Sequence, residues 1–469
     1  MARISRSIYI LIAALIVIAA IAISISFILA PSPTPTPTPT ETTPTPTPTT
    51  PTPPTTPTTP PTTPLTPPRN ITVKVGIVLP LTGAFALFGQ DTLRGVLTAI
   101  DMFNEKQLIP GVTVIPIVAD SQSDATVAAS EAERLITVEN VDIIIGSYAG
   151  PLAMAISTVA ERYNVPHYEV IAAPNALTMN RGYKWVFRFG PAGLYYGYAA
   201  VDFLVEFAKK MGWDISTLKI AVVHEDGPYG TSCADGDVER LEYYGLTPIT
   251  RERYPAATTD LSSLIMKLKT LEVDVVLITS YFSDAKLFLM QSYELGFKPK
   301  IIIGHSAGFE LPALAEAVGD LIKGVFVVGF PLLGMDTTGL LPEVQQEVVE
   351  FLEYYQQKYG SLPASWGAKA FSATYHVFLK EVLRIALEKY GEINRETIRK
   401  AFLEVDIPDG GTFVGFGVKF APPDHPWAGE NLKATLHPVC EWFGTRPEDL
   451  KAVWPPHLAT AEPQLIPRP

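Results

Sequence analysis

The segment Ile71-Thr72-Val73-Lys74-Val75-Gly76-Ile77-Val78-Leu79, which ends at Pro80, decides the fold class of this 469-residue chain. A short run of Val and Ile bounded by a turn residue is typical of a strand buried on both faces. Further runs of this kind alternate with amphipathic helical patterns, which indicates parallel sheets covered by helices. The strand-like runs lie at residues 71–79, 112–119, 141–145 and 165–171, then at 218–224, 248–253, 274–279 and 300–303. We therefore predict an α/β fold with two consecutive doubly wound parallel sheets.

The last part of the chain breaks this alternation. Residues 342–359, 366–390 and 395–403 have helical patterns, and only two short strand-like segments follow, at 411–420 and 436–443. These elements have no sheet of their own, so we expect them to complete the first two lobes, with the chain crossing between the lobes more than once. Ligands of open α/β sheets bind beyond the carboxyl ends of the strands, so two facing sheets predict a cleft.

The N-terminal region predicts export. Residues 8–30 form an apolar run long enough to cross a bilayer as a helix. Arg3 and Arg6 precede this run and no basic residue follows before Arg69, which favours a cytoplasmic N-terminus and an extracellular body. We interpret residues 1–30 as a membrane anchor, with a cleaved signal peptide as the alternative, which would make the body a secreted protein.

Residues 31–68 consist almost entirely of Pro and Thr. Such a segment buries too little apolar surface to fold, so we expect a disordered stalk with a reach of about 100 Å if it is extended. Its composition is also typical of O-glycosylated stalks. Asn70-Ile71-Thr72 at its outer end is an N-glycosylation sequon, which makes Asn70 a candidate glycosylation site.

Composition excludes several classes of protein. The net charge is −12 and no cluster of Lys or Arg is present, which argues against nucleic acid as a partner. The chain lacks the spacing of metal-binding His and Cys motifs and lacks a phosphate-binding loop, so we predict no metal site, no cofactor and no ATP hydrolysis. Cys233 and Cys440 are the two cysteines, and whether they form a disulfide stays open.

The segments that end the predicted strands resemble the leucine/isoleucine/valine-binding family, the solute-binding proteins of ABC importers with the type I periplasmic fold. The resemblance spans nearly all of residues 71–465. It rests on the order and spacing of residues 73–83 (VKVGIVLPLTG) with 88–89 (FG), 144–150 (IIGSYAG), 165–167 (VPH), 224–230 (HEDGPYG), 254–256 (YPA) with 259–261 (TDL), and 453–460 (VWPPHLAT).

This resemblance implies that three crossovers form a hinge between the lobes, near residues 187–190, 325–330 and 412–418. Lobe 1 would then hold residues 69–189 and 331–413, and lobe 2 would hold residues 190–330 and 414–465. It also implies that the lobes close on a small solute and deliver it to ABC permease subunits with a separate ATPase. A ligand-sensing receptor ectodomain is the alternative.

Position by position, the resemblance also implies the ligand contacts. Lobe 1 would contribute Phe88, Tyr148, Ala149, Gly150, Ala172 and Ala173, and lobe 2 would contribute Tyr229, Tyr281 and Ser306. Backbone N–H groups at the strand-to-helix turns would bind a carboxylate. The aromatic rings would cover an apolar ligand body.

Three of these positions depart from the amino-acid binders of the family. Those proteins usually carry hydroxyl residues where this chain has Gly150 and Ala173, and an acid for the α-ammonium where it has Ser306. A buried ammonium without a carboxylate is costly. Either the solute is not an ordinary α-amino acid, or another acid supplies that charge, with Glu169 as the first candidate and Asp226 as the second. We therefore expect the solute to be a branched-chain amino acid, an amide or a related small organic molecule.

An enzymatic function is the weakest of the alternatives. Gly304-His305-Ser306-Ala307-Gly308 has the pattern of a serine hydrolase nucleophile after a strand, with His376, His425 or His437 as the candidate base. No oxyanion segment lies upstream, and the resemblance already accounts for this loop as a ligand-binding turn. We therefore predict no catalytic residues.

Overall fold

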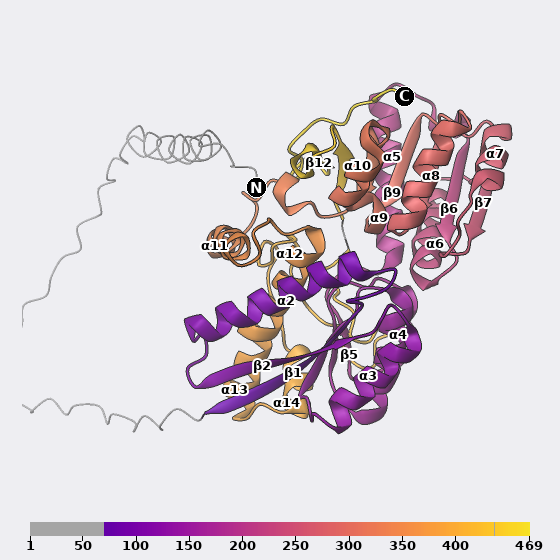
Figure 1. Ribbon diagram of the computed structural model, residues 1–469. Coiled ribbons are helices and arrows are strands. Elements are labelled where there is room, and N and C mark those ends of the chain that lie inside the picture. The colour runs from indigo at the N-terminus through magenta and orange to yellow at the C-terminus, as the bar shows by residue number, and fades with distance from the viewer. Residues whose placement is uncertain (1–69, 436) are drawn as a thin grey trace, which may run out of the picture. The chain divides into compact units, whose positions relative to one another are not determined.

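The computed structural model describes residues 70–435 and 437–469 (Figure 1). The predicted anchor and stalk, residues 1–30 and 31–68, lie outside the described residues. Within residues 70–435 and 437–469, no helix has the length and apolar character needed to cross a membrane. Asn70, the first described residue, is exposed.

The first sheet has five parallel strands in the order β2-β1-β3-β4-β5. Helix α2 (Ala86–Lys106) packs on this sheet, as do α3 (Ala125–Thr137) and α4 (Gly150–Tyr163). The predicted doubly wound unit is confirmed. The strands are β1 (Ile71–Leu79), β2 (Val112–Asp120), β3 (Ile143–Gly146), β4 (His167–Glu169) and β5 (Val186–Arg188).

The second sheet has seven strands in the order β12-β11-β10-β9-β8-β6-β7. The five strands from β10 to β7 run parallel, whereas β11 and β12 are added antiparallel at one edge. The sheet is therefore mixed, because its last two strands come from the C-terminal part of the chain. The strands are β6 (Ile220–Glu225), β7 (Thr250–Tyr254), β8 (Val275–Thr279), β9 (Ile301–His305), β10 (Val325–Val328), β11 (Val439–Trp442) and β12 (Leu450–Trp454).

Helices cover both faces of the second sheet (Figure 1). On one side, α5 packs along α6 and contacts β9, β10 and β11. On the other side, α8 contacts α7, α9 and α10. Their bounds are α5 (Gly193–Lys210), α6 (Pro228–Tyr243), α7 (Ser262–Thr270), α8 (Phe282–Glu294), α9 (Ala307–Glu310) and α10 (Pro312–Val318).

The late helices pack with the elements of the first sheet. They are α11 (Pro342–Tyr359), α12 (Ser365–Ser372), the π-helical stretch η5 (Ala373–Val382), α13 (Leu383–Tyr390) and α14 (Arg395–Phe402). Phe402 of α14 stacks on Phe187 of β5 with ring centroids 4.5 Å apart. Tyr355 of α11 donates a hydrogen bond of 3.0 Å to Asp91 of α2. Aromatic burial therefore fixes these helices on the first sheet.

The predicted boundary after residue 413 differs from the structure. Glu430 pairs with Arg188 of β5 in an isolated parallel bridge. The Phe420 ring contacts Tyr168 and Phe187, at centroid distances of 6.1 Å and 5.5 Å. Residues 414–431 therefore pack with lobe 1, and the chain next enters the second sheet at β11. The segment at 411–420 is not a strand and makes only isolated bridges.

Several other elements were missed by the sequence pattern, among them α5, α10, β10 and β12. Helix α5 begins with Gly193-Leu194-Tyr195-Tyr196-Gly197, in which glycine and aromatic residues obscure the helical period. Residues 325–330, predicted as a crossover, begin with strand β10 before the chain returns to lobe 1. Cys233 and Cys440, whose pairing stayed open, are both buried and unpaired.

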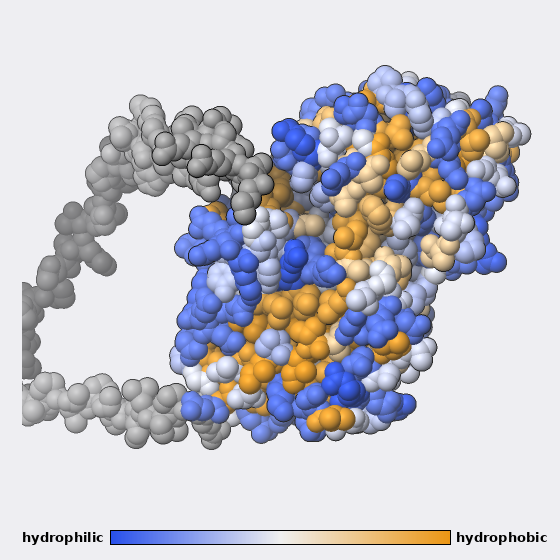
Figure 2. All heavy atoms as spheres, viewed as in Figure 1, coloured by the Kyte–Doolittle hydropathy of each residue, from blue (hydrophilic) through white to orange (hydrophobic). Residues whose placement is uncertain are grey.

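Strand β2 forms an exposed edge of the first sheet. Pro116 lies within this strand, where its missing N–H is tolerated because the outer side of an edge strand has no partner. Ile115 and Val118 of β2 are 44% and 38% exposed. Figure 2 shows apolar surface on this face, over the region where Figure 1 places β1 and β2.

Candidate functional site

A pocket lies where the carboxyl ends of the strands of both sheets meet. From lobe 1, the loop after β3 contributes Tyr148 and Gly150, and the loop after β4 contributes residues 171–173. Helix α12, which packs on lobe 1, adds Trp366 and Lys369. Strand ends are where open α/β sheets bind ligands, so the position agrees with the predicted cleft.

Lobe 2 forms the opposite wall. Tyr229 follows β6, Tyr281 follows β8, and Ser306 and Ala307 follow β9. Tyr196 projects from the first turns of α5. Each of these loops carries one or two side chains into the pocket, so the second sheet contributes to the wall through three neighbouring strands.

Aromatic rings bring the two walls into contact. Tyr281 of lobe 2 lies 6.3 Å from Tyr148 and 4.7 Å from Phe85 of lobe 1, measured between ring centroids. Tyr229 lies 5.8 Å from Tyr281. The free volume between the walls is about 30 Å³, room for one or two water molecules. The structure is therefore a closed form, and a larger solute enters only when these rings separate.

The pocket wall contains backbone in a conformation that L-residues rarely adopt. Tyr148 has φ of 88°, Ser306 has φ of 33° and Ala307 has φ of 32°. Positive φ at non-glycine residues costs free energy and persists where the surrounding structure enforces it, often at ligand-binding sites. All three residues line the pocket.

The hydroxyl groups of the wall differ in their partners. Tyr229 donates to the carbonyl oxygen of His305 at 2.8 Å. The Tyr148 hydroxyl is buried and has no hydrogen-bond partner within the described structure. Burial raises the pKa of the Tyr148 hydroxyl well above its usual range, so the group stays protonated at neutral pH and can donate a hydrogen bond.

One ion pair borders the pocket. Lys369 of α12 lies 3.5 Å from the carboxylate of Glu310, measured from Nζ to Oε2. Glu310 is buried at the end of α9 and also accepts bonds from the Ser306 hydroxyl at 2.5 Å and from the Phe330 N–H at 3.0 Å. The Lys369 ammonium lies 5.3 Å from the ring centre of Phe330 and 5.7 Å from that of Trp366.

Several predicted contacts lie behind the wall and do not line the pocket. Phe88 stacks on Tyr148 with centroids 4.4 Å apart, so it supports that ring from behind. Ala149 is buried as the N-cap of α4. Of the other predicted residues, those that line the pocket are Tyr148, Gly150, Ala172, Ala173, Tyr229, Tyr281 and Ser306.

Glu169 is also absent from the lining. Its Oε1 accepts bonds from the N–H groups of Ile171 and Ala172 at 2.9 Å and 2.7 Å, and its Oε2 accepts one from the Ser147 hydroxyl at 2.9 Å. The carboxylate therefore shapes the loop after β4. Burial raises the pKa of Glu169, although these hydrogen bonds lower it. Asp226, the second predicted substitute, lies at a separate surface cleft and not in this pocket.

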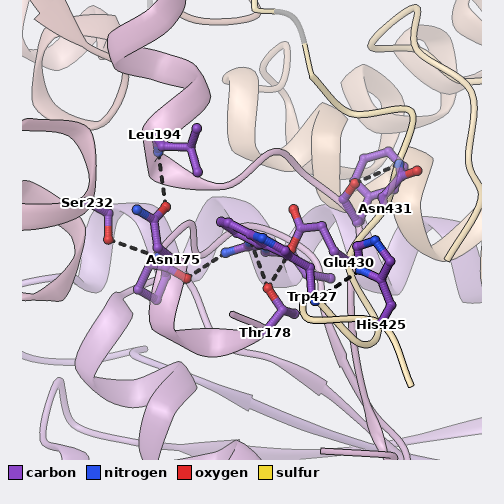
Figure 3. A network of polar contacts seen from close by, with 11 residues as sticks. Asn175, Thr178, Leu194, Ser232, His425, Trp427, Glu430 and Asn431 are labelled. Atoms are coloured by element: carbon purple, nitrogen blue, oxygen red, sulfur yellow. Dashed lines mark hydrogen bonds and ion pairs between the residues drawn. The ribbon is translucent and has the colours of Figure 1, made fainter. Parts of the chain in front are cut away.

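A buried polar network holds the chain where it crosses between the lobes (Figure 3). Arg188 at the end of β5 pairs with Glu430 and donates to the carbonyl oxygen of Pro174 at 2.6 Å. Thr178 donates to Glu430 at 2.6 Å. Asn175 receives a bond from the Leu194 N–H at 3.1 Å, so the loop after β4 is tied to the start of α5.

The same loop contacts lobe 2 directly. The Asn175 N–H donates to the Ser232 hydroxyl of α6 at 2.9 Å, which Figure 3 also shows. Asn431 donates to the carbonyl oxygen of Phe189 at 3.0 Å, on the segment that leads into α5. The crossing segments are therefore fixed to one another by polar contacts on both sides of the junction between the lobes.

Ser306 lacks the surroundings of a hydrolase nucleophile. Its hydroxyl donates to the carboxylate of Glu310, whereas a serine nucleophile of the Ser-His type donates to an imidazole. The neighbouring His305 side chain points elsewhere and bonds to Thr279 and Asp237 at 2.9 Å and 3.1 Å. His376 contacts Glu347 instead.

Sequence reasoning missed part of the wall. The missed residues are Ile171, Tyr196, Ala307, Trp366 and Lys369. Tyr196 was hidden because α5 itself was not recognised. A signal existed for Lys369, which is the only charged residue in the otherwise uncharged, buried run from Ser365 to Leu379. Charged side chains are seldom buried without a purpose or a partner.

Comparisons with known proteins agree with this architecture. A family model described as periplasmic binding protein matches residues 72–431. Leu/Ile/Val-binding protein homolog 7 of Brucella abortus is 37% identical over 350 residues, which are 74% of this chain and 85% of that protein. Homolog 8 of the same species is 34% identical over 392 residues, which are 83% of this chain and 92% of that protein.

Solved structures show the same fold. A leucine-binding protein from Thermotoga maritima matches with a TM-score of 0.64 and 25% identity, covering 78% of this chain and 94% of that chain. A substrate-binding protein of a branched-chain amino acid transporter from Streptococcus pneumoniae, in complex with isoleucine, has a TM-score of 0.65. At 18% identity, with 81% of this chain and 98% of that chain covered, it supports the fold alone.

Proposed function

We propose that this chain, which belongs to the periplasmic binding protein family of the Leu/Ile/Val-binding proteins, is the substrate-binding component of an ABC importer. It captures a small organic solute in the pocket between its two sheets and delivers it to permease subunits. The relatives carry names of solute-binding proteins, and the chain is not an enzyme.

The single observation that carries this proposal is the origin of the pocket wall. Loops after β3 and β4 of one sheet face loops after β6, β8 and β9 of the other. A solute held there contacts both lobes at once, so its binding favours the closed form over the open form. This coupling of capture to closure is what a delivery protein requires.

The aromatic wall provides the test of solute capture. Tyr281 contacts Phe85, Tyr148 and Tyr229, so Tyr281→Ala removes the ring at the centre of the closed pocket. Solutes that bind the wild-type full chain are first identified because they raise its melting temperature. We expect each of them to bind the Tyr281→Ala variant with an affinity at least about tenfold lower than for the wild type. Isothermal titration calorimetry measures the change.

Tyr293→Ala is the matched control, because Tyr293 lies on the same helix and is 55% exposed. It should leave solute affinity unchanged. Equal affinity of the Tyr281→Ala variant for every bound solute would contradict the location of the site.

We extend the proposal to the place where the protein acts. The apolar run at residues 8–30, with Arg3 and Arg6 before it, supports a single uncleaved anchor that leaves the body outside the cell. The Pro/Thr-rich residues 31–68 would then form a stalk, with Asn70 as a glycosylation site at its outer end. Carbonate extraction of membranes and the intact mass of the mature chain test this: a soluble chain that lacks residues 1–30 would contradict it.

The remaining partners are the permease and its ATPase. Cross-linking in native membranes followed by mass spectrometry should recover permease subunits with the full chain. Recovery of a sensor protein in their place would favour the ligand-sensing alternative.

A further inference from the structure

The pocket wall carries an unbalanced set of polar groups. Among the lining residues that the structure describes, none is acidic, and Lys369 is the one with a charged side chain. The other polar side chains are the hydroxyls of Tyr148, Tyr196, Tyr229, Tyr281 and Ser306, together with the indole of Trp366. Lysine and indole groups only donate hydrogen bonds, whereas a hydroxyl donates one and can also accept. The hydroxyls of Tyr229 and Ser306 already donate to the His305 carbonyl oxygen and to Glu310. The charge that the wall presents is therefore the single positive charge of Lys369.

Glu310 only partly satisfies the Lys369 ammonium. The separation of 3.5 Å is longer than the 2.7–2.9 Å typical of a charge-assisted hydrogen bond. Each oxygen of Glu310 already accepts a shorter bond, Oε2 from Ser306 and Oε1 from Phe330. The ammonium has three N–H donors and, among the residues that the structure describes, Glu310 is the one that accepts from it, so donors remain for a group in the pocket.

Tyr148 provides an independent indication of the same kind. Its hydroxyl is buried, lines the same pocket and has no partner within the described residues. A buried hydroxyl without a partner is unfavourable unless a ligand or water completes it. Lys369 and Tyr148 therefore each have a donor that a hydrogen-bond acceptor on the solute would satisfy.

An ammonium group on the solute would meet no acidic side chain among the described residues of the pocket wall. It would lie in a wall that contains Lys369 and lacks a carboxylate, while Glu310 lies behind Ser306 and Glu169 is occupied by its own loop. A buried ammonium without a carboxylate is costly, and a neighbouring positive charge adds repulsion. An α-amino acid would satisfy Lys369 with its carboxylate but would leave its ammonium unpaired.

We infer that the solute is a small carboxylate with an apolar body and no α-ammonium group, and that its carboxylate pairs with Lys369. This inference rests on the proposed solute-binding function. The rings of Tyr148, Tyr229, Tyr281 and Trp366 enclose the apolar body. Lys369 is then the residue that favours solutes with a negative charge.

Matched compounds test the solute class. For each of several aliphatic and aromatic bodies, the full chain in detergent is heated with the α-amino acid, the carboxylate without the amino group, the primary amide and the amine. For a leucine-like body these are leucine, 4-methylpentanoate, 4-methylpentanamide and 3-methylbutylamine. We expect the carboxylates to raise the melting temperature most and to bind at least about tenfold more tightly than the matching amino acids.

Each outcome has a distinct meaning. If an amino acid binds as tightly as its matching carboxylate or more tightly, solute capture stands and the inference about class is overturned. If amides or amines bind best, the inference is likewise overturned. If no compound of any class changes the melting temperature, the proposed capture function itself fails.

Variants of Lys369 test its role. Lys369→Met should weaken binding of the best carboxylate by about 30-fold or more, and Lys369→Arg should retain much of the affinity. Lys380→Met, on the following π-helical stretch and paired with Glu347, is the control and should bind as the wild type does. Unchanged affinity of the Lys369→Met variant would overturn the pairing.

A double variant separates ligand binding from structural support, because Lys369→Met alone leaves Glu310 without its counter-charge. Lys369→Met with Glu310→Gln removes both charges and restores local neutrality. If Lys369 binds the solute, carboxylate affinity stays low in the double variant even though its melting temperature recovers. Recovery of carboxylate affinity would show that Lys369 only balances Glu310 and would overturn the inference.

Discussion

Asp284 is a residue whose ionisation the fold opposes. It lies in the first turn of α8, and its Oδ2 accepts a bond from the Tyr254 hydroxyl at 2.8 Å. Its other oxygen is buried without a partner in the described structure. Burial raises the pKa of Asp284 to about 7, although the Tyr254 bond lowers it. The native state therefore favours the protonated acid.

A pH dependence of stability follows. The native pKa of about 7 lies above the unfolded value of about 3.9, so the unfolded chain loses its proton first as the pH rises. The stability that this proton contributes is fully present below about pH 4 and is lost as the pH rises through 7. Asparagine keeps an acceptor for Tyr254 and carries no charge. We expect Asp284→Asn to exceed the wild type in unfolding free energy by on the order of 2 kcal/mol at pH 8, and to match it within about 1 kcal/mol at pH 4.5.

Urea unfolding at both pH values measures this difference. Asp235→Asn is the control, because Asp235 has an exposed carboxylate that pairs with Arg251, and it should show no such gain at pH 8. A wild type that is more stable than the Asp284→Asn variant at pH 8 would show that the carboxylate is charged and satisfied in the native state.

At the scale of elements, the contact between α2 and α12 positions the pocket. The two helices approach so closely that a Cβ atom on Gly95 would lie 2.0 Å from the carbonyl oxygen of Gly367. Backbone atoms cannot move aside as a flexible side chain does. Since α12 carries Trp366 and Lys369, this glycine contact fixes where both side chains meet the pocket.

We expect Gly95→Ala to lower the unfolding free energy by about 1–3 kcal/mol, because the added methyl group forces the helices apart. Displacement of α12 should also weaken solute binding in the variant that still folds. Gly339→Ala is the control: no atom lies within 4 Å of the added Cβ, and its φ is not positive. Thermal and urea unfolding measure the stability of both variants. Equal stability would mean that the helices separate at little cost.

At the scale of the whole molecule, the buried pair of Arg188 and Glu430 links the end of the first sheet to the segment that leads to β11. The side chains are 0% and 4% exposed. Removing one partner of a buried ion pair leaves the other charge uncompensated, which costs more than the pair itself contributes. The crossing region therefore depends on both residues together.

We expect Glu430→Ala to lower the unfolding free energy by about 3–5 kcal/mol. Replacing both members, as in Arg188→Met with Glu430→Leu, should recover part of that loss because no charge stays buried. A double-mutant cycle by urea unfolding, with Arg188→Met and Glu430→Leu made singly and together, measures the coupling between the two positions. Additive losses would show that the two charges do not depend on each other.

The amino-acid sequence by itself determined the fold class, the order of most elements and the side of each sheet at which the site lies. These features are local: buried parallel strands require runs of Val and Ile, helices require their own period, and strand ends follow from both. The failures have one local cause and one long-range cause. Helix α5 has an obscured period, and the segment 414–431 takes its place from Phe420 and Glu430, which pair with distant residues of lobe 1.

Only the tertiary structure decided the chemistry of the pocket. The role of a charged side chain depends on what lies beside it, and those neighbours come from other parts of the chain. The Glu169 carboxylate accepts hydrogen bonds from Ser147 and from its own loop. Lys369 lies on helix α12, late in the chain, and lines the pocket together with the loops that follow the strands. Long-range packing places these charges, so the sequence predicted that the pocket lies at the strand ends, and the fold decided which charged side chain lines it.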